Sequence, residues 1–260
     1  MANKNLSLSA QYFQESTPSD IPCREENFIR REIPFSLPVE QTALMLVDLW
    51  NAHHIDSWIE RAEDIVKEKI VPVTEAARKA GVTVVHAPSP ELLKNNKYDI
   101  FQRHLERAGK VEPAWPPKEF RLRQEEYAAF QMPPKQPPGV DARWQKIAPT
   151  LDMTPHLRPK EGEYVIANAE QLQHLCTTKK FLHLIYAGFA TNWCVLQRDY
   201  GMIQMSERGY NCLLIRDATE GVEYPDTLEQ KWAREIAIRE TEQRYGFSIS
   251  SEDFLRACRS

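Results

Sequence analysis

The sequence predicts a three-layer α/β/α sandwich built on a mostly parallel sheet of five or six strands. Continuous apolar runs, such as residues 43–47 and 82–87, are typical of strands buried on both faces of a parallel sheet. Segments with apolar residues at helical spacing separate these runs along the chain. Such alternation predicts right-handed crossovers between neighbouring parallel strands.

The first 90 residues predict an extension followed by a strand, a helix and a second strand. Residues 1–40 are polar and contain four prolines, so we expect an N-terminal extension with one or two short strands ahead of the domain, 41–260. Ser57 and Glu60 fit a capping box at the start of the helix. Pro72 predicts a kink in it and Gly81 predicts its end.

Residues 88–160 interrupt the alternation and form an insertion rich in proline and aromatic residues. One short helix is expected over 98–107, followed by ten of the eighteen prolines. A long surface excursion and an ordered lid are the alternatives. The aromatic side chains in this segment favour the lid, because a solvated linker rarely contains so many. They are Trp115, Phe120, Tyr127, Phe130 and Trp144.

Regular alternation returns in the last hundred residues. Strands are expected at 163–168, 181–188, 210–218 and 247–250, and helices at 170–179, 192–208 and 226–245. The expected helix after the strand 181–188 is closed by Gly209.

Composition excludes several classes of function. A net charge of −4 provides neither a basic face for nucleic acid nor a polybasic membrane anchor. No run reaches the roughly 18 apolar residues of a membrane span, and the N-terminus lacks the apolar core of a signal peptide. Five cysteines without CxxC spacing fit free thiols, so we expect a cytoplasmic protein.

Candidate chemistry lies at the carboxyl ends of the strands, where parallel α/β sheets form their ligand crevices. The residues delivered there are Asp48, Trp50, Asn51, His53, His54, His86, Asn168, Cys194 and Asp217. Asp217 is expected to make a structural loop contact.

Cys194 differs from the other cysteines by its position at the start of an expected helix. Free N–H groups and the helix dipole favour an anion there and lower the pKa of a thiol. Thr191 can cap this helix, and the backbone N–H groups of Ala190 and Cys194 can hold an oxyanion. Asp48, at the end of an apolar strand, can act as the general base for the thiol. A buried structural cysteine and a loop-capping aspartate remain the alternatives.

Two segments resemble the isochorismatase-like cysteine hydrolases, a family that includes nicotinamidases and N-carbamoylsarcosine amidohydrolases. MLVDLWN is similar to their strand that ends in Asp, two residues and Asn, and GFATNWCV to their nucleophile segment. The resemblance covers about residues 40–90 and 160–250. It implies that Cys194 attacks a C–N substrate to form a thioester, with Asp48 as the base. It also implies a cis peptide bond between Phe189 and Ala190, and a homo-oligomer.

The third catalytic residue departs from that resemblance. The family has a lysine at the end of its third strand, and alignment on 163–168 places Asn168 there. Asparagine donates a hydrogen bond but has no charge. The missing charge could come from Lys160, His53, His54 or His86. Two hypotheses follow: an active hydrolase with a modified triad, which we prefer, or an inactive relative that binds a ligand or a partner.

The remaining candidates line the expected pocket for a small-molecule substrate. They are Trp50, His53, His54, His86, Phe189 and Trp193. Trp50 and Trp193 could form an aromatic wall, although core packing explains such residues equally well. Adjacent histidines rarely share one metal, and the metal spacing of nicotinamidases is absent, so we expect no metal. GxGxxG and P-loop motifs are also absent, so we expect no cofactor.

Overall fold

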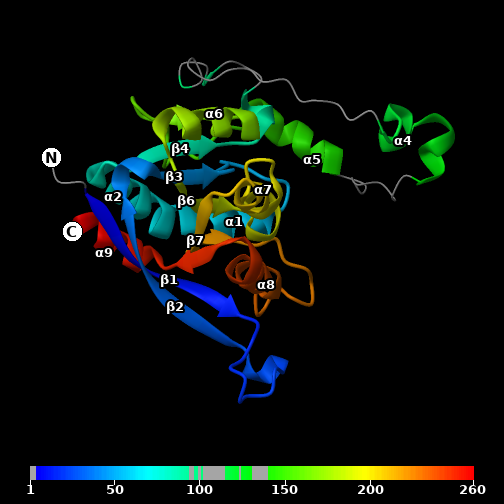
Figure 1. Ribbon diagram of the computed structural model, residues 1–260. Helices are drawn as coiled ribbons and strands as arrows, with labels where there is room; N and C mark the ends of the chain where they lie inside the picture. The colour runs from blue at the N-terminus through cyan, green and yellow to red at the C-terminus, as the bar shows by residue number, and fades with distance from the viewer. Residues whose placement is uncertain (1–3, 94–96, 99–100, 102–114, 123, 131–139) are drawn as a thin grey trace.

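The computed structural model describes residues 4–93, 97–98, 101, 115–122, 124–130 and 140–260. These residues form one eight-stranded sheet in the order β2-β1-β8-β7-β6-β3-β4-β5, with helices on both faces (Figure 1). The strands are β1 (Asn5–Gln14), β2 (Ile29–Pro38), β3 (Thr42–Val47), β4 (Thr83–Ala87), β5 (Tyr164–Val165), β6 (His183–Phe189), β7 (Asn211–Glu220) and β8 (Phe247–Ile249). Strands β3 to β8 are parallel, which confirms the predicted fold class.

Helices fill the connections between these strands. The described α-helices are α1 (Asp56–Ile65), α2 (Val71–Ala80), α4 (Lys118–Leu122), α5 (Val140–Ile147), α6 (Ala169–Lys179), α7 (Met202–Glu207), α8 (Trp232–Glu240) and α9 (Ser251–Arg259). Short π turns are η3 (Val66–Ile70), η7 (Thr191–Val195) and η8 (Thr241–Tyr245). The 3₁₀ turns are η1 (Glu25–Asn27), η2 (Val39–Gln41), η4 (Pro90–Leu93), η5 (Glu125–Phe130) and η6 (Ala148–Thr150).

Strand β3 shows why both faces of the sheet are covered. All six of its residues are buried. Leu44 and Leu46 belong to the core beneath α1, α2 and α9, whereas Met45 and Val47 belong to the core beneath α6 and α7. Alternate side chains of a strand point to opposite faces, so an apolar run without polar interruption needs two helical layers.

The N-terminal extension is more regular than predicted. Strands β1 and β2 have ten residues each and pair antiparallel along their whole length, and β1 also pairs with β8. Leu6, Leu8 and Ala10 alternate into the core. The prolines Pro34 and Pro38 lie in β2, the edge strand, where no further strand needs their missing N–H groups.

Several expected helices have different bounds. The helix expected over 192–208 is split into η7 and α7. A Cβ at Gly201 would lie 2.6 Å from the Leu196 carbonyl oxygen, so the chain closes on itself at this glycine. The helix expected from residue 226 begins at Trp232. Strand β5 has only two residues.

The helical segment after β3 also differs in detail. Helix α1 begins at Asp56, and its N-cap is Ile55 without a side-chain cap, so the expected capping box is wrong. Helical structure continues past Pro72. The π turn η3 leads into α2, and the proline lies in the first turn of α2, where proline is tolerated. Gly81 ends α2 with a left-handed backbone, φ 86°, as expected.

The chain reverses its direction of sheet growth between β3 and β6. Strands β4 and β5 extend the sheet on one side of β3, and β6 then returns to the other side. Ligand crevices of open α/β sheets form at such a switch point. Gly188 lets the two strands meet closely, since a Cβ there would lie 2.1 Å from the Val47 carbonyl oxygen.

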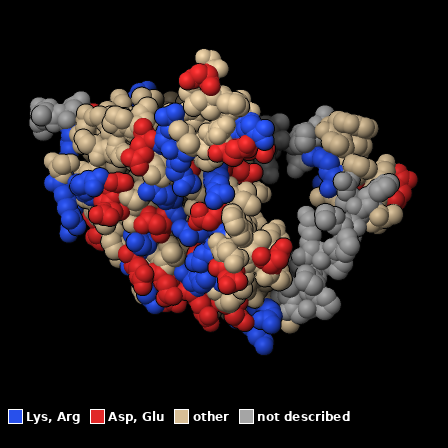
Figure 2. Space-filling model, turned by 90° about the horizontal axis from the view of Figure 1, so that it is seen from below, with Lys and Arg blue, Asp and Glu red and all other residues tan. Residues whose placement is uncertain are grey.

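The surface in Figure 2 carries acidic and basic side chains side by side rather than in separate fields. Among the described helices, none combines the length and the apolarity that crossing a bilayer requires. The insertion returns to the body through α5 and the following residues, whereas most of the helix expected over 98–107 lies outside the described residues.

Candidate active site

Asp48 directly follows β3 and is only 3% exposed. Its backbone is left-handed, φ 45°, a conformation that aspartate tolerates better than most residues. One carboxylate oxygen accepts a hydrogen bond from Trp50 Nε1 at 3.2 Å, and the other accepts from Arg198 Nη2 at 3.2 Å. Burial raises the pKa of this carboxyl group, against the lowering effect of Arg198.

Cys194 lies in η7, the turn after β6, and its thiol lies close enough to the Asp48 carboxylate for each group to affect the pKa of the other. The switch point thus brings together the two residues that strand-end reasoning placed there. Burial, followed by the charge of Asp48, raises the pKa of the Cys194 thiol to about 12. Arg198 and a backbone hydrogen bond with Ala190 act in the opposite direction.

The expected lowering of this pKa by a helix N-terminus is wrong for a local reason. The segment is a five-residue π turn and not the start of a long α-helix. Its N–H groups at Trp193 and Val195 both donate to the Ala190 carbonyl oxygen, at 3.0 and 3.1 Å. A short turn whose N–H groups are used internally has little dipole left for an anion.

The end of β7 anchors η7, the turn that contains Cys194. The Thr219 hydroxyl donates to the Gly188 carbonyl oxygen at 2.7 Å and shares a second hydrogen bond of 2.7 Å with the Thr191 hydroxyl. Thr191 therefore serves this link rather than the predicted helix cap. Asn192 forms two 3.0 Å hydrogen bonds with the backbone of Val222. The peptide bond between Phe189 and Ala190 is cis, where the family resemblance placed it.

Arg198 is a site residue that the sequence reasoning missed. Its backbone N–H donates to the Cys194 carbonyl oxygen at 3.2 Å, so it lies one helical turn after Cys194. Its side chain, 30% exposed, forms an ion pair with Asp48. Asp48 raises the pKa of the guanidinium still further. The four-residue spacing from Cys194 was the available signal, because residues four apart share one helix face.

Three residues considered for the missing lysine have other partners. The Asn168 side chain caps α6 by accepting from the Gln171 N–H at 2.9 Å. His86, 2% exposed, contacts Glu163 at 2.8 Å. Lys160 donates to Glu75 at 3.0 Å. In the part of the chain that the structure describes, none of the three hydrogen-bonds Asp48 or Cys194.

Aromatic rings and imidazoles pack together beside Asp48. The ring centroids of Trp50 and His53 are 5.4 Å apart, and those of Trp50 and Trp144 are 5.9 Å apart. His54 lies 5.1 Å from Trp144, which belongs to α5 of the insertion. Burial, with a smaller contribution from His54, lowers the pKa of His53 to about 4. Burial likewise lowers the pKa of His54.

Through Trp58 this aromatic cluster reaches Phe189, at the end of β6 just before η7. The Trp58 ring lies 4.6 Å from that of His53 and 5.8 Å from that of Phe189. Trp193, the neighbour of Cys194, is instead 40% exposed. Of the predicted pocket residues, Trp50, His53, His54 and Phe189 are thus connected, whereas His86 belongs to a separate network.

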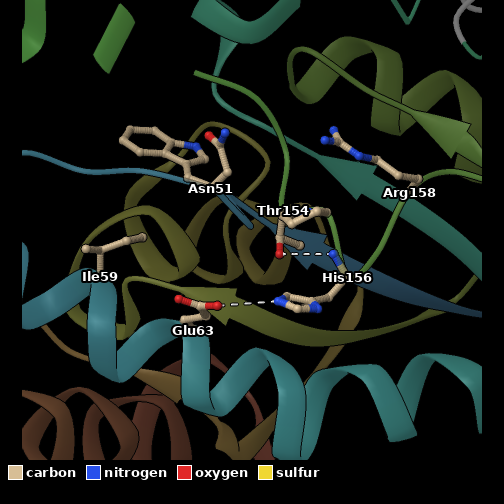
Figure 3. Close-up of a pocket in the computed structure, with 8 residues that line it drawn as sticks. Asn51, Ile59, Glu63, Thr154, His156 and Arg158 are labelled. Carbon is tan, nitrogen blue, oxygen red and sulfur yellow. Dashed lines mark hydrogen bonds and ion pairs between the residues drawn. The ribbon is translucent and has the colours of Figure 1, made fainter. Parts of the chain in front are cut away.

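A pocket of about 290 Å³ lies beside Trp50 (Figure 3). It is lined by Trp50, Asn51, Ile59, Glu63, Thr154, Pro155, His156 and Arg158. Glu63 from α1 and His156 from the end of the insertion point toward one another and lie 3.5 Å apart. Trp50 both lines this pocket and donates to Asp48.

No cluster of three or more potential metal ligands occurs among the described residues. Asp217, expected to be structural, accepts from the Ser251 N–H at 2.7 Å and from its hydroxyl at 2.6 Å at the start of α9.

Comparisons with known proteins show the family to which this chain belongs. Ureidoacrylate amidohydrolase RutB from Azorhizobium caulinodans is 26% identical over 245 residues, which cover 87% of this chain and 94% of that protein. A cysteine hydrolase from Pseudomonas syringae pv. phaseolicola has a similar fold, with a TM-score of 0.57 at 17% identity, covering 86% of this chain and 94% of that one. The Isochorismatase domain model matches residues 42–253, and the chain therefore belongs to the isochorismatase family.

Proposed function

We propose that this protein is a cysteine-dependent hydrolase that cleaves the C–N bond of a small amide, ureido or imide substrate. The observation that supports this most directly is the position of the Cys194 thiol beside the buried Asp48 carboxylate at the switch point of the sheet. A thiol next to a buried carboxylate has its general base in place.

In the first half of the reaction, Asp48 takes the thiol proton while the Cys194 sulfur forms a bond to the substrate carbonyl carbon. The raised pKa values fit this order, because the thiol stays protonated until a carbonyl is bound. The carbonyl oxygen becomes an oxyanion, for which the backbone N–H groups of Ala190 and Cys194 are the donors we assign.

The second half of the reaction releases the nitrogen-containing leaving group and then the acid product. The C–N bond breaks, and protonated Asp48 gives its proton to the leaving nitrogen, which leaves a thioester on Cys194. Asp48, ionised again, takes a proton from water as the water oxygen attacks the thioester carbon. The C–S bond then breaks, the sulfur recovers its proton, and the acid product leaves.

The nature of the substrate rests on two supports. The relative named ureidoacrylate amidohydrolase aligns along most of both chains. The cluster of Trp50, His53 and Trp144 provides flat surfaces beside Asp48, which suit a planar amide or ureido group. Histidines whose pKa is lowered by burial are neutral at pH 7 and donate or accept hydrogen bonds without a charge.

Turnover of a substrate panel tests this function. The panel contains ureidoacrylate, N-carbamoyl amino acids and primary amides, and ammonia release is measured. Cys194→Ala should lower the rate on any active substrate by about 10⁴-fold, since the covalent route is lost. Cys23→Ala, at an exposed cysteine, is the control and should leave it unchanged. A loss smaller than tenfold for Cys194→Ala contradicts the proposal.

The alternative is a relative that binds a ligand without turning it over. The raised pKa of Cys194 is the observation that favours it, because a protonated thiol is a poor nucleophile. Absence of turnover across the panel, together with Cys194 labelling by iodoacetamide no faster than that of Cys23, would support this alternative.

A further inference from the structure

Arg198 connects the two halves of the proposed active site. Its backbone belongs to the segment that follows Cys194, and its guanidinium reaches across to Asp48 at the end of β3, with Nη2 3.2 Å from Oδ2. Its Nε is buried and has no hydrogen-bond partner among the described residues. The group is therefore held at the site with donor capacity that Asp48 does not use.

The site needs a positive charge for an electrostatic reason. A buried carboxylate beside a thiol opposes ionisation of the sulfur, and Asp48 does so here. Within a partly buried site such a charge is poorly screened. A guanidinium stays protonated at neutral pH, so it neutralises one negative charge throughout the reaction.

The other charged and titratable groups near Cys194 do not supply this charge. In the described part of the chain, the groups that act on Cys194 or Arg198 include Asp48, directly after β3, and Tyr200 from the segment after Cys194. The pKa of the Tyr200 hydroxyl is raised, mainly by burial, so this group is neutral. Lys160 and His86, considered for the role from sequence, bond instead to Glu75 and Glu163.

We propose that Arg198 is the positioning residue that supplies the positive charge of this active site, in place of the lysine that the family resemblance led us to expect. Its position on the segment of the nucleophile, rather than on the third strand, frees Asn168 to cap α6. This inference rests on the proposed function, because a charge beside Cys194 matters for catalysis only if Cys194 is the nucleophile.

The pH dependence of Cys194 alkylation tests the inference without a substrate. Wild type, Arg198→Gln and Arg198→Lys are labelled with iodoacetamide between pH 7 and 10, and each cysteine is read by mass spectrometry. Below the pKa, the rate is proportional to the thiolate fraction. Removing the charge in Arg198→Gln should slow Cys194 by about tenfold at each pH, equivalent to a rise of about one pKa unit. Arg198→Lys should restore most of the rate.

Two internal controls accompany this experiment. Cys23 is exposed and calibrates the reagent in every variant. Arg208→Gln is the matched surface variant, because the Arg208 side chain is 31% exposed and pairs with Glu170 at 2.8 Å. It should leave Cys194 labelling unchanged. Equal Cys194 rates in wild type and Arg198→Gln, relative to Cys23, overturn the inference.

Loss of folding is recognised by labelling of the buried Cys176 and Cys212. If Arg198→Gln exposes them, Asp48→Asn is compared with the double variant Asp48→Asn/Arg198→Gln, which leaves no charge unpaired. The double variant should still label Cys194 more slowly, and equal rates overturn the inference.

Turnover assays distinguish a failure of this inference from a failure of the proposed function. Retained turnover in Cys194→Ala refutes the function itself. Dependence on Cys194 together with full turnover and an unchanged pH profile in Arg198→Gln refutes only the role of Arg198. The expected result is turnover lowered about 100-fold or more in Arg198→Gln, with partial rescue in Arg198→Lys.

Discussion

Two buried carboxylates in this protein are paired with arginines, and they differ in how fully they are hydrogen-bonded. Glu163, just before β5, accepts from Arg78 at 2.5 and 3.0 Å, from the Lys160 N–H at 2.9 Å, and contacts His86 Nε2 at 2.8 Å. Despite burial, hydrogen bonds from His86 and Arg78 lower the pKa of Glu163 to about 2.

Asp48 has the same kind of arginine partner but weaker support. The hydrogen bonds that it accepts from Trp50 and Arg198 are each 3.2 Å long, and burial outweighs them, so its pKa is raised. A carboxylate with every lone pair engaged stays ionised and cannot serve as a base. The proposed base is therefore only partly hydrogen-bonded, whereas the carboxylate of Glu163 is fully bonded and links β4, β5 and α2.

The largest effect expected from this comparison is on catalysis. Asp48→Asn preserves the size of the side chain but cannot take the thiol proton, so kcat/KM should fall by about 10³-fold. Glu163→Gln, which changes the other carboxylate in the same way, should keep kcat/KM within about threefold of wild type when assayed on folded protein. Similar losses in the two variants would mean that both networks act in the reaction.

Gly188→Ala should separate β3 and β6, the strands that bring Asp48 and Cys194 together. The new Cβ would lie 2.1 Å from the Val47 carbonyl oxygen at a residue with φ 119°, so we expect a loss of about 3–5 kcal/mol in unfolding free energy. Gly162→Ala, beside Glu163, is the control. Its φ is 85° with no atom within 4 Å of the added Cβ, so it should lose only about 1–2 kcal/mol. Urea unfolding measures both, and equal losses would contradict the close approach of β3 and β6.

Glu163→Gln tests how the charge of Glu163 contributes to the pH dependence of the free energy of unfolding. The pKa of Glu163 is lowered to about 2, so its stabilisation is fully present above the ordinary value of 4.5 and is lost as pH falls through the folded value. The variant should therefore be less stable than wild type by about 2–3 kcal/mol at pH 7, with a smaller difference at pH 3. Urea unfolding at the two pH values measures this.

The control for that variant is Glu75→Gln. Glu75 also pairs with Arg78, but its side chain is 41% exposed. Screening by water should limit its effect to less than about 1 kcal/mol at both pH values. A difference between Glu163→Gln and wild type that does not change with pH would show that packing, rather than charge, accounts for the stabilisation.

The parallel core was predictable from sequence because each of its strands is a local apolar run. The N-terminal hairpin was underestimated, since its four prolines outweighed the period-two pattern of Leu6, Leu8 and Ala10. That pattern is a strand signal. The prolines within β2 are tolerated at the edge of the sheet, and which strand forms the edge is a property of the whole fold.

The candidate site was likewise predictable from sequence only in part. Asp48 and Cys194 lie together, as strand-end reasoning expects, because the switch-point rule depends only on strand order. The role of Asn168 in the site stays a prediction, while its sequence context, directly before a helical segment, is that of the N-cap that it forms on α6. The network of Arg78, His86 and Glu163 joins residues far apart in the chain, and no local pattern predicts it.

The smallest expected effect concerns the second donor to Asp48. Trp50→Phe removes the Nε1–H hydrogen bond of 3.2 Å to the carboxylate while keeping most of the ring packing. A hydrogen bond to the ionised form lowers a carboxyl pKa, so its loss should raise the pKa of Asp48 further. Asp48 must be ionised to accept the thiol proton, and the acidic limb of the kcat/KM profile should therefore move to higher pH by about half a unit. Trp144→Phe, which alters a ring 5.9 Å from that of Trp50 but no donor to Asp48, should leave the limb in place. An equal shift in both variants would assign the effect to the aromatic cluster, and the incomplete hydrogen bonding of Asp48 would then not be what sets its protonation.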